Sequence, residues 1–127
     1  MSTSIRSIST PEAFGPPALS QGMQFGNLVF VSGQVGILPD GIGAPDGLEG
    51  EIETAIDGLE AVLRAAGSSL DLVLKTSCYV SDISYLEVFN KIYVRRFHPP
   101  FPARTTIQAT LAMGLRFEID AVAVIGS

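Results

Sequence analysis

The spacing of apolar residues predicts two helices. From Glu51, apolar side chains recur at intervals of three and four residues up to Gly67, and glycine is typical of a helix C-terminus. A second helix is predicted to begin near Ser84, because Ser84 and Glu87 match a capping box, and Pro99-Pro100 prevents its continuation. The two apolar stripes consist of Ile52, Ala55, Ile56, Leu59, Val62, Leu63 and Ala66, and of Leu86, Phe89, Ile92, Tyr93 and Phe97.

Runs with a period of two predict the strands. The longest run spans 115–125, and shorter runs span 5–8, 27–33, 73–80 and 104–111. In the 73–80 run we expect Leu74, Thr76, Cys78 and Val80 to share one face. The segments 9–22 and 39–50, rich in proline and glycine, are predicted to be loops, and Met113-Gly114 a turn. The pattern predicts one α+β domain over 1–127.

The last predicted strand has two different faces. Leu115 and every second residue after it are apolar, whereas the opposite face mixes Glu118 and Asp120 with Val122 and Val124. Two helices can cover one face of a small sheet, so these valines, with Val29 or Phe30 of an earlier strand, need another cover. We expect a neighbouring subunit to provide it.

Composition narrows the function classes. The 127 residues include 8 Lys plus Arg and 13 Asp plus Glu, and the net charge of -5 argues against nucleic acid as a partner. No apolar run reaches the roughly 18 residues of a membrane span. The single cysteine, Cys78, suits a reducing compartment, so we expect a cytoplasmic protein. With one histidine, His98, a site of several histidines is impossible, and no metal or other cofactor is expected.

Six short fragments, in this order and at nearly these spacings, resemble the RidA (YjgF) family: Gly15-Pro16, Ser20-Gln21, Val31-Ser32-Gly33-Gln34, Asn90 with Tyr93, Pro102-Ala103-Arg104-Thr105, and Phe117-Glu118-Ile119-Asp120-Ala121. The resemblance implies a chorismate-mutase-like fold, in which a mixed sheet is backed by two helices and three copies form a central barrel. It also implies hydrolytic deamination of 2-aminoacrylate-type enamines and 2-imino acids to 2-oxo acids and ammonia, in clefts between subunits and without a cofactor.

The same resemblance assigns roles to single residues. It implies that Arg104 binds the substrate carboxylate, that Glu118 positions or activates water, and that Thr106 contributes a backbone N–H. Ser32, Gly33 and Asn90 match further pocket positions. The chain also departs from the family: Leu19 stands where the family has a tyrosine, Thr106 replaces a common cysteine, and the interval from Arg104 to Glu118 is one residue shorter than in many members.

The residues themselves leave other interpretations open. Arg104 suits a carboxylate because its planar guanidinium offers a fork of donors, but most arginines form only exposed ion pairs. Glu118 is a candidate for a cross-strand salt bridge with an arginine, in which case Asp120 is the substitute. Ser32-Gly33 is also consistent with the simple end of a strand, and Asn90 with a polar surface position.

Two further functions compete with a deaminase. The first is a non-catalytic small-carboxylate-binding or chaperone-like trimer that uses the same cleft, favoured by the missing tyrosine. The second is a ribonuclease of the endoribonuclease L-PSP type, a name found in the history of this family. An acidic chain with one histidine offers neither a phosphate-binding surface nor an acid–base pair for that reaction.

Overall fold

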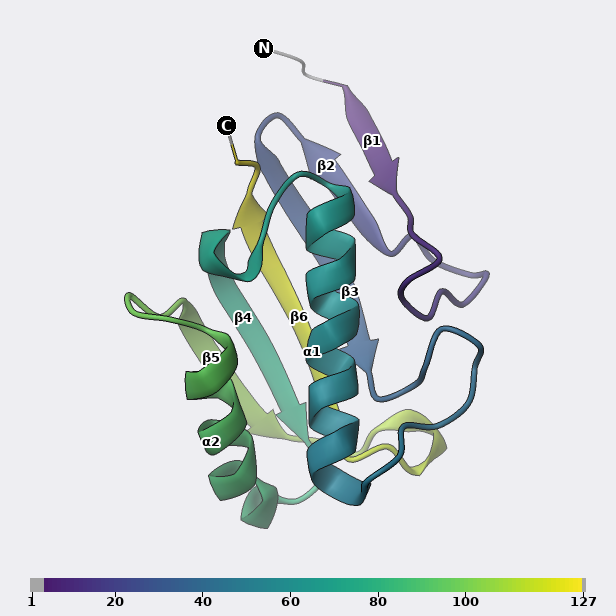
Figure 1. Ribbon diagram of the computed structural model, residues 1–127, viewed down its shortest axis with the longest axis vertical. Helices are drawn as coiled ribbons and strands as arrows, with labels where there is room; N and C mark the ends of the chain where they lie inside the picture. The colour runs from purple at the N-terminus through teal and green to yellow at the C-terminus, as the bar shows by residue number, and fades with distance from the viewer. Residues whose placement is uncertain (1–3, 127) are drawn as a thin grey trace.

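The computed structural model describes residues 4–126, which form a six-stranded sheet with two helices on one face (Figure 1). The strand order is β1-β2-β3-β6-β4-β5, and neighbouring strands are antiparallel except β4 and β5, which are parallel. The elements are β1 Ile5–Ile8, β2 Gly22–Phe25, β3 Leu28–Val35, α1 Gly47–Ala65, β4 Val73–Val80, α2 Leu86–Arg96, β5 Ala103–Gln108 and β6 Phe117–Val124. The predicted α+β class with a mixed sheet is confirmed.

Helix α1 packs its predicted apolar stripe against the sheet. Ile52, Ala55, Ile56, Leu59, Val62 and Leu63 are fully buried. The helix begins at Gly47, earlier than the predicted start at Glu51. Glu51 is itself buried and accepts hydrogen bonds from the backbone N–H groups of Arg116 and Phe117. After the helix, Gly67 has a φ of 83°, the left-handed conformation that favours glycine at this position.

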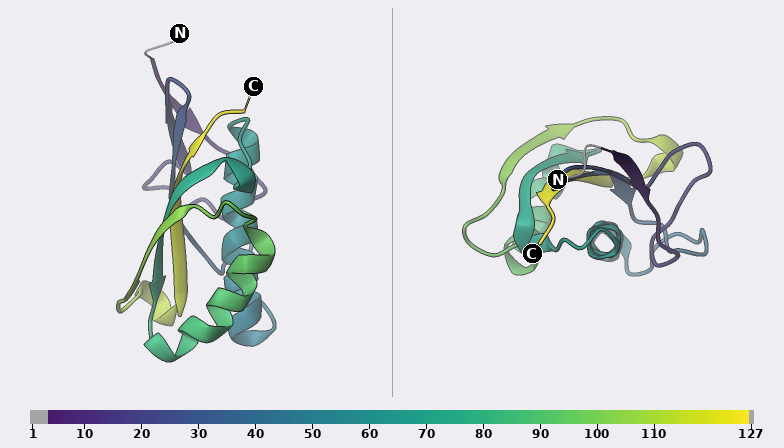
Figure 2. Two further views of the ribbon diagram at one scale, coloured as in Figure 1. Left: turned by 90° about the vertical axis from the view of Figure 1, so that its left-hand side faces the viewer. Right: turned by 90° about the horizontal axis from the view of Figure 1, so that it is seen from above.

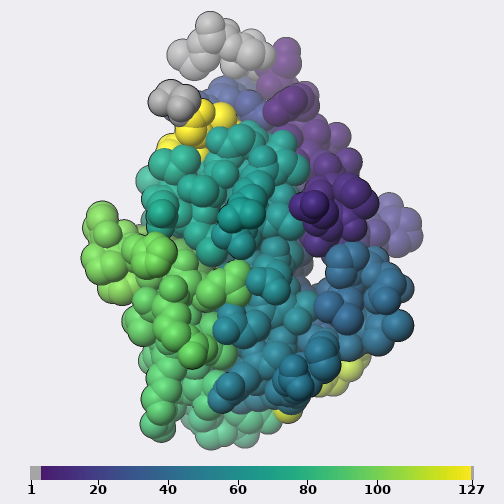
Figure 3. Space-filling model, in the orientation of Figure 1, coloured from purple at the N-terminus to yellow at the C-terminus, as the bar shows by residue number. Residues whose placement is uncertain are grey.

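The capping box predicted at Ser84 and Glu87 is wrong. The side chain of Asp82 accepts a hydrogen bond of 2.8 Å from the backbone N–H of Ser84, and a short 3-10 turn, Ile83–Tyr85, precedes α2. An ionised carboxylate is a good acceptor beside the positive end of a helix, and these hydrogen bonds lower the pKa of Asp82. Figure 3 shows the atoms of α1 (blue to teal) and of α2 (green) side by side on one face of the molecule.

Several strand boundaries differ from the prediction. β2 was missed because its four residues have no clear alternation, and β3 continues to Val35 through a register shift between Val31 and Gln34. β5 ends at Gln108 and β6 begins at Phe117, so both are shorter than predicted. Leu74 is half exposed instead of buried, because a second register shift at the start of β4 turns Val73 inward.

The other face of the sheet has no helix over it within residues 4–126, as the side view in Figure 2 shows. On β6 the side chains that point away from the helices are half-buried, and they belong to Glu118, Asp120, Val122 and Val124. Of the two candidates on β3, Val29 is buried and Phe30 is 47% exposed. We call this surface the open face. None of the helices in the described range is long and apolar enough to cross a membrane.

Candidate active site

Arg104 lies on the edge strand β5 and points to the helix side of the sheet. Its Nε donates to the hydroxyl of Thr106 at 2.8 Å, and its Nη2 donates to Oδ1 of Asn90 at 2.6 Å. The guanidinium carbon lies 4.8 Å from the ring centres of both Phe89 and Tyr93 on α2. We call these five residues the Arg104 group. Two hydrogen bonds and two aromatic rings therefore fix the orientation of the guanidinium.

Arg104 differs from four of the five other arginines of the folded body in its lack of a carboxylate partner; the exception, Arg6, donates instead to the side-chain oxygen of Gln24. Arg96 holds Glu53 at 2.6 Å and Asp57 at 2.8 Å, and Arg116 holds Glu51 at 2.8 Å. In the described part of the chain Arg104 forms no ion pair, and its two hydrogen bonds use two of the five N–H donors of a guanidinium. The remaining donors suit an anion from outside the chain, which argues against an ordinary surface role.

Thr106 and Asn90 were both predicted as site residues, and both contact the guanidinium directly. The Thr106 hydroxyl accepts a hydrogen bond from Arg104, a contact that the sequence did not suggest. Its predicted backbone N–H contact to substrate stays a prediction. The aromatic support from Phe89 and Tyr93 was missed as part of the site, because at sequence level both residues belong to the apolar stripe of a helix. The one available signal was that Tyr93, together with Asn90, belongs to the fragments that resemble the family.

Glu118 lies on the open face, opposite to the side on which Arg104 points. Its neighbours in register are Tyr79 on β4 and Val35 on β3, and its carboxylate lies over Gly33. A Cβ added to Gly33 would lie 2.8 Å from the carboxyl carbon of Glu118, so a glycine is required for this approach. Among residues 4–126 no arginine or lysine forms an ion pair with Glu118, and the cross-strand salt bridge is not formed.

Burial and a second carboxylate adjust the proton affinity of Glu118. Its partial burial raises the pKa of the carboxyl group, and the negative charge of Asp120 raises it further. Burial also raises the pKa of Asp120, whose Oδ2 accepts a hydrogen bond of 3.4 Å from the Tyr79 hydroxyl. A carboxylate with a raised pKa exchanges protons closer to neutral pH, which suits a group that handles water and ammonia.

A cavity of about 270 Å³ lies beside Glu118. Its walls come from the loop before β2, from the end of β3 and from the turn before β6, and they are mostly apolar: Phe14, Pro16, Leu19, Gly33, Gln34, Val35, Ala112, Met113 and Leu115. Leu19 and Gly33, both predicted site residues, therefore lie at the same cavity as Glu118. We call Glu118, Gly33, Leu19 and Ser32 the Glu118 group.

Ser32 precedes Gly33 at this cavity, but its polar atoms form hydrogen bonds with the loop before β2. Its hydroxyl donates to the Ser20 carbonyl at 2.6 Å, and its N–H donates to the Gln21 carbonyl at 2.9 Å. These two bonds connect β3 to the segment that carries Leu19. The structure thus gives Ser32 a positioning role, whereas the sequence suggested contact with substrate.

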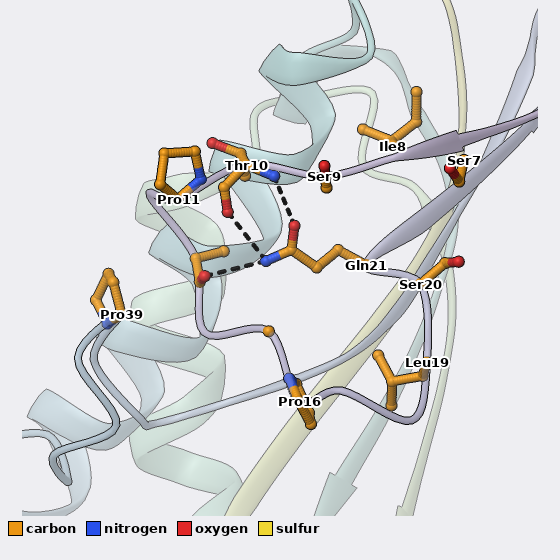
Figure 4. A pocket seen from close by; sticks show the side chains of 12 residues that line it. Ser7, Ile8, Ser9, Thr10, Pro11, Pro16, Leu19, Ser20, Gln21 and Pro39 are labelled. Atoms are coloured by element: carbon orange, nitrogen blue, oxygen red, sulfur yellow. Dashed lines mark hydrogen bonds between the residues drawn. The ribbon is translucent and has the colours of Figure 1, made fainter.

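A larger hollow of about 590 Å³ lies on the other side of the same loop (Figure 4). Its buried polar residue, Gln21, was noted in the sequence only as part of a motif. The Gln21 amide accepts from the Thr10 N–H at 2.6 Å and donates to the carbonyls of Thr10 at 3.1 Å and Ala13 at 3.0 Å. Because these hydrogen bonds satisfy the amide, we assign Gln21 to loop structure, which keeps Leu19 near the cavity.

The seven predicted site residues therefore form two groups within one chain. The Arg104 group is on the helix side of the edge strand β5, and the Glu118 group is on the open face at β3 and β6. Strand β4 lies between β5 and β6, so the two groups do not meet in a single copy. For Glu118 to act beside Arg104, a second copy of the chain would have to provide one of the two groups, and the family resemblance implies such clefts between subunits.

A small α+β fold with an unpaired arginine and a carboxylate of raised pKa defines a candidate carboxylate-binding enzyme. Residues 8–125 match the family described as Endoribonuclease L-PSP, and the chain belongs to this family, which includes the RidA (YjgF) proteins. It is 37% identical over 132 residues to a mouse 2-iminobutanoate/2-iminopropanoate deaminase, with 99% of this chain and 96% of that protein covered.

Two other relatives extend the comparison. The chain is 33% identical over 117 residues to the chloroplastic Reactive Intermediate Deaminase A of Arabidopsis thaliana; this match covers 91% of the chain but spans only 62% of that longer protein. The solved structure of E. coli TdcF with bound serine superposes with a TM-score of 0.88 at 25% identity, and covers 95% of this chain and 99% of that one.

Proposed function

We propose that the protein hydrolyses 2-imino acids and 2-aminoacrylate-type enamines to 2-oxo acids and ammonia, in clefts between the subunits of a homotrimer. The observation that carries this proposal is the division of the candidate residues into two incomplete groups on opposite faces of the sheet. A neighbouring copy that brings its Glu118 group against the Arg104 group completes the site. The exposed Phe30 and Ile107, each 47% exposed, support such a contact between copies.

The proposed reaction assigns one task to each group. Arg104 binds the substrate carboxylate and so fixes the position of the imine carbon. Glu118 accepts a proton from a water molecule as the water oxygen bonds to that carbon and the π electrons of the C=N bond move to nitrogen. Glu118 returns this proton to nitrogen, which gives the neutral carbinolamine. In the collapse that follows, the hydroxyl proton passes through Glu118 to nitrogen, the C=O bond forms, the C–N bond breaks, and nitrogen leaves as ammonia.

The overall equation balances without another reactant: imino acid plus water gives 2-oxo acid plus ammonia. 2-Aminoacrylate enters the same path after its terminal carbon takes a proton and its nitrogen loses one, so that the enamine becomes 2-iminopropanoate. The mouse relative, a 2-iminobutanoate/2-iminopropanoate deaminase, supports this substrate class, and the serine bound to TdcF supports a small ligand of amino-acid type.

A second candidate function is a trimer that holds small carboxylates without turnover. The observation that favours it is Leu19, which is 50% exposed and lines the cavity where the family has a tyrosine. Loss of the phenol removes a donor that would otherwise help to hold water or ammonia. Such a protein still requires Arg104 as the anchor, so binding alone does not separate the two functions.

The deciding experiment measures turnover. Imines are generated in situ from alanine and 2-aminobutyrate by an amino-acid oxidase, and the appearance of the 2-oxo acid is followed with and without the protein. We expect the wild type to accelerate this step and Arg104→Ala to approach the buffer rate. If wild type leaves every imine at the buffer rate while pyruvate still binds by calorimetry, the binding function replaces the deaminase.

The assembly is tested separately by light scattering at micromolar concentration. We expect the mass of three copies of the single domain 1–127, and a monomeric mass would remove the cleft on which the proposal depends. We also propose a cytoplasmic location, because the one cysteine, Cys78, is buried in the core and the fold uses no disulfide within residues 4–126.

A further inference from the structure

Two exposed apolar side chains line the cavity beside Glu118. Leu19, on the loop before β2, is 50% exposed, and Met113, in the turn before β6, is 77% exposed. Phe14, Pro16 and Leu115 extend the apolar wall between them. Burial in the core does not account for two such exposed side chains, whereas a ligand bound in the cavity would cover both.

The backbone at Met113 is also unfavourable for methionine. Met113 has a φ of 60° and a ψ of 24°, followed by Gly114 with a φ of 68°, and the turn is closed by a 3.1 Å hydrogen bond from the Leu115 N–H to the Ala112 carbonyl. Glycine and asparagine adopt this left-handed conformation more readily. Neither folding nor burial within one copy therefore explains a large thioether at this position, whereas contact with an apolar ligand in the cleft between copies does.

The charges around the cavity limit the ligand further. Of the lining residues, Glu118 carries the ionisable group, and burial and Asp120 raise its pKa. A ligand part that enters the cavity meets hydrocarbon and thioether walls with a carboxylate at one end. A negatively charged side chain would be repelled by that carboxylate, and a neutral polar side chain would lose its hydration without finding partners on these walls.

We propose that Leu19 and Met113 determine specificity by accepting the substrate side chain between them, so that the protein prefers 2-imino acids with branched aliphatic or thioether side chains. This inference rests on the proposed deaminase function and identifies the substrate class for it. The volume of about 270 Å³ suits a small amino-acid-derived acid. Met113 acts as an adaptable wall because its unbranched side chain has three rotatable bonds.

The test compares kcat/KM for imines derived from leucine, alanine and glutamate. We expect the wild type to prefer the leucine-derived imine over the alanine-derived one by at least about tenfold, since a single additional methylene enclosed in an apolar pocket contributes about that much discrimination. Met113→Lys should remove about tenfold from the leucine-derived imine, leave the alanine-derived one within about twofold and improve the glutamate-derived one. Leu19→Tyr should reduce the same leucine-to-alanine ratio.

Val94→Ala is the matched control. Val94 is an apolar residue on α2 with 55% exposure and does not line the cavity, so its loss should leave the leucine-to-alanine ratio unchanged. Because the readout is a ratio between two substrates of the same enzyme preparation, a variant that folds less well lowers both rates and does not change the ratio.

A second readout does not depend on turnover. By calorimetry, 4-methyl-2-oxopentanoate should bind about tenfold more tightly than pyruvate, and Met113→Lys should abolish the difference. If no imine is hydrolysed, the deaminase proposal fails, and the calorimetric ratio alone decides the specificity inference. If imines are hydrolysed but neither Met113→Lys nor Leu19→Tyr changes the leucine-to-alanine ratio, the specificity inference is wrong and the deaminase stands.

Discussion

The Arg104 group and the Glu118 group differ in what their surroundings control: the orientation of a side chain in the first, and the pKa of a side chain in the second. Arg104 is held by two hydrogen bonds and two aromatic rings, which fix the orientation of its guanidinium. Glu118 has few polar contacts, lies at an apolar cavity, and has a pKa raised by burial and by Asp120. A residue that anchors a carboxylate needs a fixed orientation, whereas a residue that moves protons needs an adjusted affinity for them.

Replacement of Arg104 should have the largest effect. Arg104→Ala removes the anchor, and we expect kcat/KM to fall at least about a hundredfold, because a charge-assisted bidentate contact contributes on the order of 3 kcal/mol. Arg104→Lys keeps the charge without the planar fork, so its kcat/KM should lie between that of the wild type and that of Arg104→Ala. Arg95→Ala is the control, since Arg95 is an exposed arginine with an ion pair to Glu53 at 3.5 Å. Equal rates for Arg104→Ala and wild type would show that the anchor is elsewhere.

Replacement of Glu118 should separate catalysis from binding. Glu118→Gln keeps the shape of the side chain but cannot accept a proton in the same way, so kcat should fall about a hundredfold while KM changes little. Pyruvate affinity, measured by calorimetry, should stay near the wild-type value. A raised KM with unchanged kcat would instead mean that Glu118 only binds substrate.

A bulkier residue at position 33 should have a similar but smaller effect. In Gly33→Ala the new methyl group would occupy space now filled by the Glu118 carboxylate, which must move away. We expect kcat to fall about tenfold with pyruvate affinity retained, as the carboxylate is displaced but not removed. Unchanged kcat would show that the position of this carboxylate over Gly33 does not matter.

Asp120→Asn should change the pH dependence more than the maximal rate. The ionised form of Glu118 is the base, so activity rises with pH as Glu118 loses its proton. The negative charge of Asp120 contributes to the raised pKa of Glu118, and its removal lowers that pKa. The acid limb of the kcat profile should therefore move to lower pH. If the acid limb stays in place or moves to higher pH in Asp120→Asn, the titrating group that causes this limb is not Glu118.

The fold was largely predictable from sequence because its determinants are periodic. The stripe of α1 and the alternation of β6 appear directly in the order of residues, and both are confirmed. Local competition between polar groups was not predictable: Asp82 rather than Ser84 caps the turn before α2, and a register shift turns Val73 inward and Leu74 outward. These outcomes depend on backbone geometry that a pattern of residue types does not contain.

The candidate site was predictable only through family resemblance. Periodicity assigns Glu118 to a mixed face and Arg104 to a strand, but it does not reveal that they point to opposite sides of the sheet. The rings of Phe89 and Tyr93 beneath Arg104 are equally invisible, because an aromatic residue in a helical stripe is normally core. Leu19 was recognisable because the family pattern has a tyrosine there, whereas Met113 required the three-dimensional cavity.

The central claim is that one working site needs Arg104 from one subunit and Glu118 from its neighbour. Two inactive variants, Arg104→Ala and Glu118→Gln, can test it when they are co-expressed in equal amounts and the resulting random mixture of trimers is purified without separating its species. Each mixed trimer then contains one cleft with both wild-type residues, so about a quarter of all clefts in a random mixture are intact. We predict recovery of imine hydrolysis to about a quarter of the wild-type rate. If the mixture is no more active than the two variants measured separately, the site is not shared between subunits and the account is wrong.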